Sequence, residues 1–409
     1  MTIPVTILSG PLGAGKTTLL NHLLTEAGDR DIAVLVNDMG EVNVDADLVS
    51  RSMDTAAGEV TELSNGCICC ELQDDLNQAV VRLAQERDFD CLVVESSGIS
   101  EPGPVAKLFT TGSRAAALYE VDALVTVLDS RQFHAAFSGG RVERRGPNEE
   151  GEKPLSDLLV EQVELANLVV LNKADLLSES ELDEVEELVR SLRPDAETVR
   201  ATYSQVDPDG LLDRGLYEPG VAAERAGWRL ALDAAEGDGD HAGADADHDH
   251  SHAHDDHSHA HGGHSHPQEE YGVTSFVYRR RRPFDPDAVA EFLADLPDGV
   301  VRSKGTMWVA GRPDTQYDYS QAGPSVHVTA AGPWIASLPE FEQDAYRRNR
   351  NIDWDDDHGD RRNELVFIGT MDREEIESAL DACLGDPEAG SVDDRFPTDP
   401  EERLVLAEP

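Results

Sequence analysis

The stretch Ile3-Pro-Val-Thr-Ile-Leu-Ser9 followed by Gly10-Pro-Leu-Gly-Ala-Gly15-Lys16-Thr17 decides the fold. Its first seven residues are mostly apolar and predict a buried strand, the glycines predict a loop, and residues 17–26 predict a helix. Glycines let backbone N–H groups surround phosphates, and the start of a helix adds its positive dipole end. We therefore predict a phosphate site in which Lys16 reaches the terminal phosphates and the Thr17 hydroxyl ligates Mg²⁺. The residues assigned to this loop are Gly10, Gly13, Ala14, Gly15, Lys16, Thr17 and Thr18.

Further short apolar runs follow at residues 32–37, 91–95, 123–129 and 168–172, with helical patterns between them. Strands that alternate with helices predict an α/β fold, with a mostly parallel sheet covered by helices on both faces. We assign residues 1–215 to this phosphate-loop domain, which a charged loop at 140–154 interrupts.

The chain changes character after residue 215. Residues 216–270 are expected to form a linker, and its segment 241–266 holds ten of the fourteen histidines without any apolar periodicity, which predicts disorder. Strand patterns at 273–278, 301–309 and 365–368, with a helical pattern at 286–296, predict a smaller α+β domain over 271–384. Residues 385–409 are acidic and contain proline, and we expect a frayed tail.

The motif Asn172-Lys173-Ala174-Asp175 follows a strand late in the first domain. A carboxylate at Asp175 can accept both the ring N–H and the exocyclic amine of guanine, a pair that adenine does not offer. With Asn172 and Lys173 beside it, this residue favours GTP over ATP. The alternative is that Asp175 only caps a helix.

Two further segments resemble nucleotide-sensing elements. Glu95 ends a strand and is followed by Ser96-Ser97-Gly98, so we expect Glu95 to activate water or position Mg²⁺ and the Gly98 amide to sense the γ-phosphate. Glu95 and Lys16 are the candidate catalytic residues; the alternative is that Glu95 acts only through a neighbouring group. Asn37-Asp38-Met39-Gly40-Glu41 occupies the position of a switch loop, and its alternative is an ordinary polar turn.

Three of the five cysteines lie in Cys67-Ile68-Cys69-Cys70, the candidate metal site. Thiolates are soft ligands that suit Zn²⁺ or Cu(I), and tetrahedral zinc takes four donors. Three thiols leave one position for Asp38, Glu41, His134 or water, an incomplete set that suits a protein handing its metal on. The alternative is buried structural cysteine, which is how we interpret the lone Cys91 and Cys383.

The histidine-rich segment could collect metal. Neutral imidazoles bind Zn²⁺, Ni²⁺, Co²⁺ or Cu²⁺, and closely spaced pairs can chelate weakly without a fold. The alternative is a solvated spacer. The residues assigned to weak metal collection are His248, His250, His252, His254, His257, His259, His261, His264 and His266.

The net charge of −48 comes from 82 acidic and 34 basic residues. Such a surface repels nucleic acid and anionic membranes, so we expect neither as a partner. Because 39 % hydrophobic content suffices for an ordinary core, we interpret the acidity as adaptation to a salty cytoplasm; the alternative is an acidic protein of a mesophile. No leader pattern or membrane-length apolar run is present, and two adjacent cysteines among five make a poor disulfide framework. We expect a cytoplasmic protein.

With these motifs in place, the chain closely resembles the CobW-type metallochaperone GTPases, relatives of the urease, hydrogenase and nitrile hydratase accessory GTPases. Asp38 departs from the family pattern, which has glutamate there, and Met39 replaces its usual aromatic residue. The residues that carry the resemblance are 10–17, 37–41, 62–70, 95–98, Glu101-Pro102, Glu161-Gln162 and 172–175, then Arg282-Pro283-Phe284, Arg302-Ser303-Lys304-Gly305, Trp308, Trp334 and 361–369.

The resemblance implies slow GTP hydrolysis coupled to delivery of Zn²⁺, or in some relatives Co²⁺, to a client metalloprotein that the second domain helps to recognise. We hypothesise that GTP and Mg²⁺ order the switch loop and complete the thiolate site, and that hydrolysis loosens it. Two alternatives stay open: a metal-storage protein that uses the histidine segment, and a GTP-driven assembly factor without a metal of its own.

Overall fold

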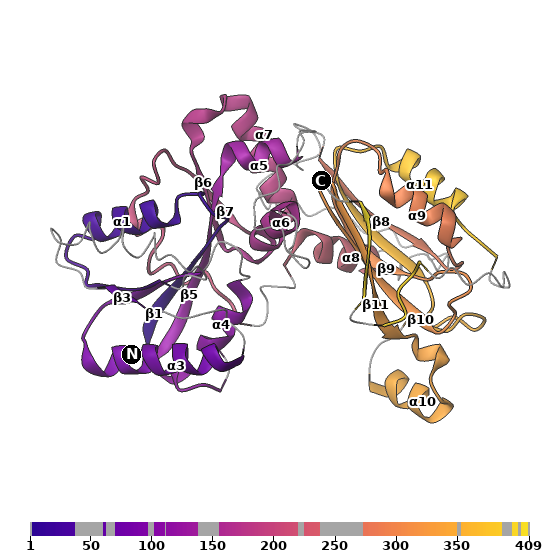
Figure 1. The fold of residues 1–409 in the computed structure, drawn as a ribbon, viewed down its shortest axis with the longest axis horizontal. Coiled ribbons are helices and arrows are strands. Elements are labelled where there is room, and N and C mark those ends of the chain that lie inside the picture. Colours follow the sequence, from indigo (N-terminus) through magenta and orange to yellow (C-terminus); the bar gives the residue numbers. More distant parts are fainter. Residues whose placement is uncertain are drawn as a thin grey trace, which may run out of the picture.

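The computed structural model describes residues 2–36, 60–62, 70–96, 102–110, 112–137, 155–219, 225–237, 273–349, 353–386, 395–399 and 402–407. Side chains are described for all of these except residues 60–62, 70–75 and 234–237. The described parts form two sheets with their helices, one from the N-terminal half of the chain and one from the C-terminal half (Figure 1).

The first sheet has seven strands in the order β3-β2-β4-β1-β5-β6-β7, and every pair of neighbours is parallel. This confirms the predicted α/β fold with a mostly parallel sheet. Its strands are β1 (Ile3–Ser9), β2 (Ile32–Val36), β3 (Val60–Glu62), β4 (Cys91–Glu95), β5 (Tyr119–Asp129), β6 (Leu168–Asn172) and β7 (Glu197–Arg200). Its helices are α1 (Lys16–Glu26), α3 (Cys70–Glu86), α4 (Pro102–Thr110), α5 (Ser130–Phe137), α6 (Leu155–Leu165) and α7 (Glu179–Leu192), with the short turns η1 (Ala115–Ala117), η2 (Ala174–Leu176) and η3 (Pro208–Gly210).

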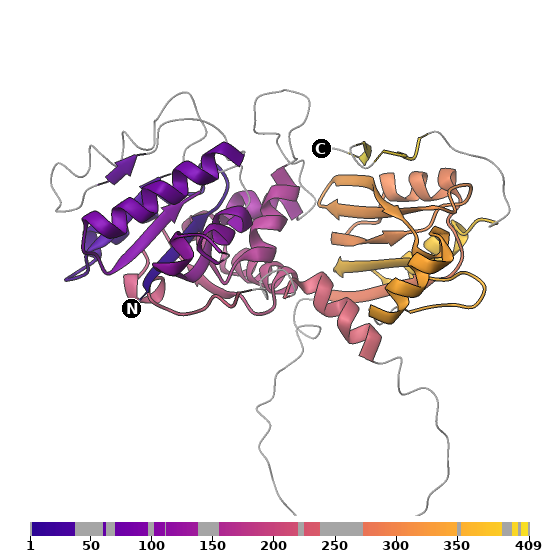
Figure 2. The same cartoon turned by 90° about the horizontal axis from the view of Figure 1, so that it is seen from below.

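Helices cover both faces of this sheet because its central strands alternate apolar side chains to either side. One face packs against α1 through Leu19, Leu20 and Leu23. The other face packs against α3 and α4 near β1 and β4, and against α5, α6 and α7 near β5 and β6 (Figure 2). Since all strands run the same way, every loop that follows a strand opens at one edge, and the candidate site lies there.

The second sheet is antiparallel, with the order β13-β11-β10-β9-β12-β8. The sequence predicted β8, β9 and β12, but missed β10 and β11. The strands are β8 (Thr274–Arg280), β9 (Val300–Met307), β10 (Thr315–Ala322), β11 (Ser325–Pro333), β12 (Asn363–Gly369) and β13 (Arg403–Ala407). The other elements of this half are α9 (Pro286–Ala294), η6 (Ile335–Ser337), α10 (Glu340–Asn349) and α11 (Arg373–Ala382).

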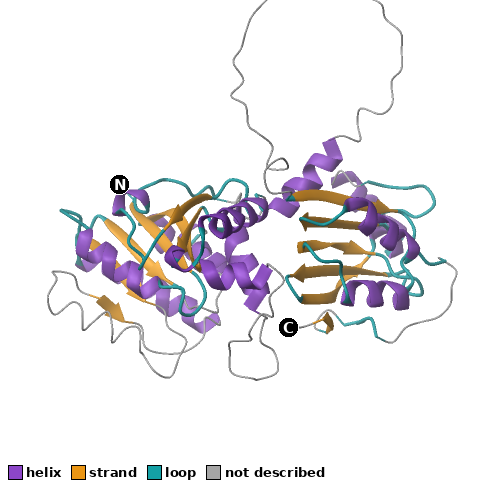
Figure 3. Cartoon of the chain, turned by 90° about the horizontal axis from the view of Figure 1, so that it is seen from above, coloured by secondary structure: helices purple, strands orange, loops and turns teal. Residues whose placement is uncertain are grey.

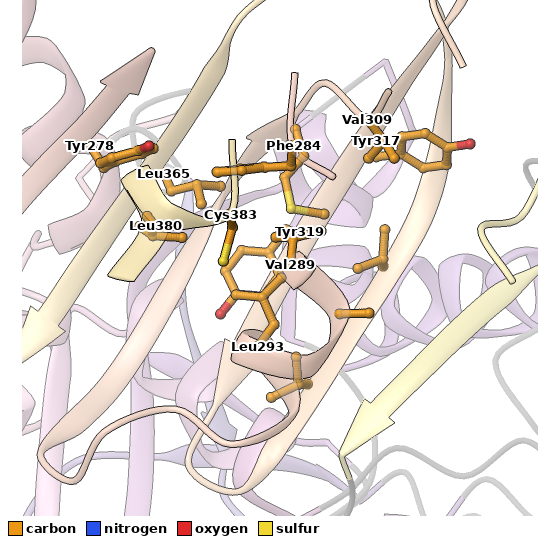
Figure 4. Close-up of a cluster of buried hydrophobic side chains, with 14 of the residues drawn as sticks. Tyr278, Phe284, Val289, Leu293, Val309, Tyr317, Tyr319, Leu365, Leu380 and Cys383 are labelled. Atoms are coloured by element: carbon orange, nitrogen blue, oxygen red, sulfur yellow. The ribbon is translucent and has the colours of Figure 1, made fainter. Parts of the chain in front are cut away.

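One face of the second sheet carries an aromatic core. Tyr278, Phe284, Tyr317, Tyr319 and Phe367 are all fully buried there, and α9 and α11 cover them (Figures 3 and 4). Burial raises the pKa of the Tyr319 phenol above its ordinary value. Cys383 belongs to this core, and Cys91 is buried in the core of the first sheet. Both lone cysteines are therefore packed in a core, as predicted.

Two segments correct the prediction. Helix α8 (Gly227–Gly237) lies inside the stretch assigned to a linker. The helix forms because Trp228, Ala231 and Leu232 recur at helical spacing and cover Val366 and Ile368 on the second sheet. Strand β13 lies inside the stretch assigned to a frayed tail. It pairs antiparallel with β11. Its alternate residues Leu404 and Leu406 pack against the aromatic core and so hold the strand on the sheet.

Within the described residues, none of the helices combines the length and the apolar character that a bilayer crossing requires.

Candidate nucleotide site

The glycine loop between β1 and α1 wraps around a buried lysine ammonium. Lys16 is only 7 % exposed, and its Nζ donates to the carbonyl oxygens of Gly10 at 2.8 Å and Pro11 at 3.2 Å. The loop ends at Gly15, the residue before α1, with φ of 109°. This left-handed backbone conformation favours glycine, so the loop can turn sharply into the helix. The Gly10 and Pro11 carbonyls and the Lys16 ammonium therefore face one another at the carboxyl end of β1.

Asn172 at the end of β6 ties this loop to the next strands. Its side-chain Nδ2 donates to the carbonyl of Ala14 and to Ser204 Oγ, both at 2.8 Å, and its Oδ1 accepts from the Ser204 amide at 2.8 Å. Ser204 Oγ also donates to the Gly15 carbonyl at 3.0 Å. A Cβ atom on Gly15 would stand 2.3 Å from Asn172 Nδ2. The predicted phosphate loop and the predicted guanine motif are thus in direct contact.

Lys173 crosses over the loop on the exposed side. Its Nζ donates to the Gly13 carbonyl at 2.8 Å and forms a 2.6 Å ion pair with Asp129, the last residue of β5. Asp175 lies in η2, where it is exposed. The N-cap of η2 is Lys173, and no side chain accepts a capping hydrogen bond there. The N-cap of the next helix, α7, is Ser178, whose side chain accepts from the Glu181 amide, so Asp175 caps neither element.

The loop after β7 contributes residues that the sequence analysis missed. Ser204 is fully buried against Asn172, whereas the neighbouring Tyr203 is 75 % exposed. Among the described residues, four non-glycine residues have positive φ, and three of them are Lys173, Tyr203 and Ser204. Such conformations cost about 1–3 kcal/mol each and concentrate at functional sites. Their signal in the sequence was a short polar turn, Thr202-Tyr203-Ser204, after a further parallel strand.

Thr17 and Glu95 face each other from α1 and β4. Thr17 Oγ1 donates to Glu95 Oε1 at 3.4 Å, and Glu95 is 4 % exposed. Ser96 holds the end of β4 to β1 because both its amide and its hydroxyl donate to the Leu8 carbonyl. The structure thus brings together the described residues predicted for phosphate, magnesium and catalysis. Thr18 follows Thr17 in α1. Gly98 lies outside the described residues.

The candidate metal ligands are mostly outside the described residues: Asp38, Glu41, Cys67, Cys69 and the histidine-rich segment. Cys70 is the first residue of α3, whose start follows β3 at the same carboxyl edge of the sheet. His134 lies on α5, with Nε2 3.1 Å from Glu184 Oε2 of α7. Within the part of the chain that the structure describes, no three His, Cys, Asp or Glu side chains come together as a metal site.

A phosphate loop, a paired threonine and glutamate, and an Asn-Lys-x-Asp motif on a parallel sheet define a phosphate-loop GTPase. The family description "CobW/HypB/UreG, nucleotide-binding domain" matches residues 4–200, and "Cobalamin synthesis protein cobW C-terminal domain" matches residues 273–384. The chain belongs to this family, which confirms the resemblance predicted from its motifs.

Two relatives by sequence agree with this assignment. "Zinc-regulated GTPase metalloprotein activator 1" of Dictyostelium discoideum is 36 % identical over 406 residues, which cover 93 % of this chain and 80 % of that protein. "Zinc chaperone CobW" of Pseudomonas aeruginosa is 40 % identical over 195 residues, which cover 45 % of this chain and 52 % of the relative. The solved structure of Zn(II)-bound YjiA GTPase from E. coli is 21 % identical, with a TM-score of 0.39, and the match covers 94 % of this chain and all of that one.

Proposed function

We propose that this GTPase uses GTP turnover to load Zn²⁺ on the Cys67-Ile68-Cys69-Cys70 cluster and to release it to a client metalloprotein. The observation that carries the proposal is a shared edge of the sheet. The phosphate loop, the Thr17–Glu95 pair and the start of α3 at Cys70 all follow strands at their carboxyl ends. A change at the nucleotide therefore acts at the edge of the sheet where α3 begins with Cys70.

The nucleotide roles follow from the contacts. Backbone amides of the loop and the start of α1 bind phosphates, and Lys16 supplies a positive charge at the terminal phosphates. Asp175 recognises guanine. Asn172 and Ser204 hold the phosphate loop in contact with the segment that carries Asp175. Lys173 contacts Gly13 of the loop, and Tyr203, the neighbour of Ser204, is exposed. These residues bind and orient GTP before any bond breaks.

The oxygen donors of Thr17 and Glu95 fit Mg²⁺, which prefers hard oxygen ligands. When bound, Mg²⁺ neutralises charge on the phosphates. Glu95 is buried, so its carboxylate keeps a fixed direction toward Thr17 and can orient the attacking water. Gly98 stays the candidate for sensing the γ-phosphate.

For the cargo, we assign Cys67, Cys69 and Cys70 as thiolate ligands, since soft donors bind Zn²⁺ tightly. We favour Asp38 or Glu41 as the fourth ligand over His134, because His134 already shares its Nε2 with Glu184. Co²⁺ is an alternative cargo that imidazole and thiolate ligands also accept. The histidine-rich segment would collect metal weakly for the thiolate site.

The test is zinc affinity, measured by competition with a chromogenic chelator in the presence of a non-hydrolysable GTP analogue or of GDP. We expect one tight zinc site, whose affinity is at least tenfold higher with the GTP analogue than with GDP. The double substitution Cys69→Ser and Cys70→Ser should abolish this site. Cys383→Ala is the matched control, because that thiol is buried in the second domain. Equal affinities in both nucleotide states would overturn the coupling, since a ligand that does not distinguish two states shifts nothing.

Deleting residues 241–266 separates the alternatives. A storage protein loses most of its bound zinc on deletion, whereas the proposed chaperone keeps the one tight site. If the doubly substituted cysteine variant still activates the client fully, the chain is a GTP-driven assembly factor that carries no metal of its own.

A further inference from the structure

Helix α6 carries a row of carboxylates toward the second sheet. Asp157, Glu161 and Glu164 are spaced by four and three residues, which places them on one face of the helix. Asp157 and Glu164 are both buried. Buried carboxylates need hydrogen-bonding partners, and the partners of these residues come from the other domain.

Glu164 pairs with Arg302 of β9. Arg302 Nε donates to Glu164 Oε1 at 2.9 Å, and the side chains are only 4 % and 9 % exposed. The same guanidinium donates from Nη1 to Ser320 Oγ at 2.7 Å and to the Gln321 carbonyl at 2.9 Å, both on β10. Arg302 thus fixes the end of α6 to two strands of the second sheet.

Asp157 and Lys304 extend this contact along the helix. Asp157 Oδ2 accepts from Ser325 Oγ at 3.1 Å and from Arg403 Nη2 at 3.3 Å. Lys304 Nζ lies 4.5 Å from the ring centre of Trp228 in α8. Burial lowers the pKa of Lys304, and the carboxylates of Glu164 and Glu161 partly offset that effect. The basic residues of the second domain therefore face the carboxylates of the first.

The surrounding packing is close. Val301 and Ala322 of the second sheet belong to the same apolar cluster as Leu159 and Val163 of α6. At the turn between β10 and β11, a Cβ atom on Gly323 would stand 3.2 Å from the Ser156 Cβ. Gly323 has a φ of 53°, a left-handed conformation that favours glycine, and its missing Cβ eases the approach of the turn to α6. The charged row is therefore embedded in a tight apolar contact.

The other side of α6 leads to the phosphate loop. Thr126 Oγ1 of β5 donates to the Gln162 carbonyl at 2.9 Å, and Ser9 Oγ lies 2.9 Å from Thr126 Oγ1. A hydroxyl has one proton, and Thr126 uses its own toward Gln162, so the Ser9 proton is available to Thr126 Oγ1 at 2.9 Å and to the Val125 carbonyl at 3.4 Å. Ser9 immediately precedes Gly10, whose carbonyl accepts from Lys16. Hydrogen bonds thus join the phosphate loop to α6, and α6 to the second domain.

We propose that the Glu164–Arg302 ion pair is the positioning contact by which the second domain sets nucleotide affinity, with α6 as the element that both sites share. The proposal rests on the GTPase function proposed above. Because coupling between two sites is reciprocal, nucleotide binding must also steady β9 and β10. A client that engages the second domain would then change how long the nucleotide stays bound.

The test compares Glu164→Gln with Glu364→Gln by stopped-flow dissociation of a fluorescent GDP analogue. Glu364 is the matched control, because it is also buried in an ion pair, but its partners Arg279 and Arg362 belong to the second domain. We expect Glu164→Gln to raise the dissociation rate about fivefold or more, within the usual range of coupling between sites. Glu364→Gln should change it less than twofold. Equal rates in the two folded variants would overturn the proposal.

Hydrogen exchange on the unmodified chain keeps the proposal falsifiable if Glu164→Gln does not fold. Saturating GDP should slow amide exchange in residues 300–307, and unchanged exchange there would contradict the coupling. The two proposals fail differently. A chain that binds no guanine nucleotide loses the proposed function, whereas one that binds nucleotide without either effect loses only this coupling.

Discussion

The nucleotide end of the first sheet and the contact between α6 and the second sheet both bury polar side chains from distant segments, yet they use them differently. At the nucleotide end, Lys16, Asn172 and Ser204 bond to backbone carbonyls, and their loops include residues with positive φ. At the α6 contact, carboxylates meet guanidinium groups on regular helix and strands. The first region holds strained loops in place for a ligand, while the second neutralises charge within the protein.

This difference predicts different consequences of mutation. A lost side chain at the nucleotide end should reduce binding or hydrolysis with little effect on unfolding. At the α6 contact, loss of either Glu164 or Arg302 should destabilise the fold, because the charge of the other stays buried.

The largest effect is expected for Lys16→Met. It removes the positive charge at the terminal phosphates, and single groups that stabilise developing charge contribute about 10²–10³-fold in rate. We expect single-turnover GTP hydrolysis to fall by about that factor while the thermal unfolding midpoint changes little. Lys107→Met, at an exposed lysine on α4, is the control and should leave the rate unchanged. A Lys16 variant of full activity would remove this lysine from the catalytic role.

Asp175→Asn should weaken GTP binding by about 100-fold, since a hydrogen bond to a charged acceptor contributes roughly 1.5–3 kcal/mol. The asparagine offers an N–H donor where the carboxylate offered an acceptor, so xanthosine triphosphate, with a carbonyl at that position, should bind better than GTP. Calorimetric titration of both nucleotides checks this reversal. Asp209→Asn, at an exposed ion pair with Arg30, should alter neither affinity. An unchanged preference for GTP would show that another group reads the base.

Gly15→Ala should cost about 1–3 kcal/mol of stability through backbone strain and also weaken nucleotide binding about tenfold. The added methyl group would stand 2.3 Å from Asn172 Nδ2 and 2.8 Å from Ser204 Oγ, so the loop must shift. Gly13→Ala provides the comparison, because that position also has positive φ but no atom within 4 Å of the added carbon. Denaturant unfolding of the two variants isolates the effect of the contact with Asn172. Equal losses of stability in both variants would mean that backbone strain alone causes the destabilisation.

How much the sequence could predict also differs between the two regions. Glycines and a lysine at fixed spacing require a particular loop, so the phosphate loop, Thr17 and the Asn172–Asp175 motif were found from neighbouring residues alone. Ser204 and Tyr203 were missed because their turn has no fixed pattern. The opposition of Glu164 and Arg302 could not be found, since those residues are far apart in sequence and meet only through packing of the two domains.

In the second domain, some missed elements did have a local signal. Tyr317 and Tyr319 alternate with polar residues along β10, a period of two that predicts a strand with one buried face. Trp228, Ala231 and Leu232 recur at helical spacing in α8. Both signals lie beside stretches rich in charge, glycine and proline, which favoured a loop or linker interpretation.

The smallest effect concerns Asp157 at the α6 contact. Burial raises the pKa of this carboxyl above its ordinary value, although Ser325, Arg403 and Arg302 oppose the shift; His327 also faces it at 3.8 Å. The folded state therefore holds the proton more tightly than the unfolded chain, and stability must fall as pH rises from the unfolded pKa, about 3.9, through the raised folded pKa. Asp157→Asn lacks this titration.

We therefore expect the free energy of unfolding of the Asp157→Asn variant to gain on that of the unmodified chain through the pH window that runs upward from the ordinary aspartate pKa of about 3.9. The gain should be about 1.4 kcal/mol for each pKa unit of the shift. Urea unfolding of both proteins across this window measures it, and subtraction cancels the titration of all other carboxyls. If the difference in unfolding free energy does not change with pH, or changes in the opposite direction, the hydrogen bonds from Arg403 and Ser325 outweigh the effect of burial on the pKa of Asp157. The charge of Asp157 would then stabilise the contact between α6 and the second sheet.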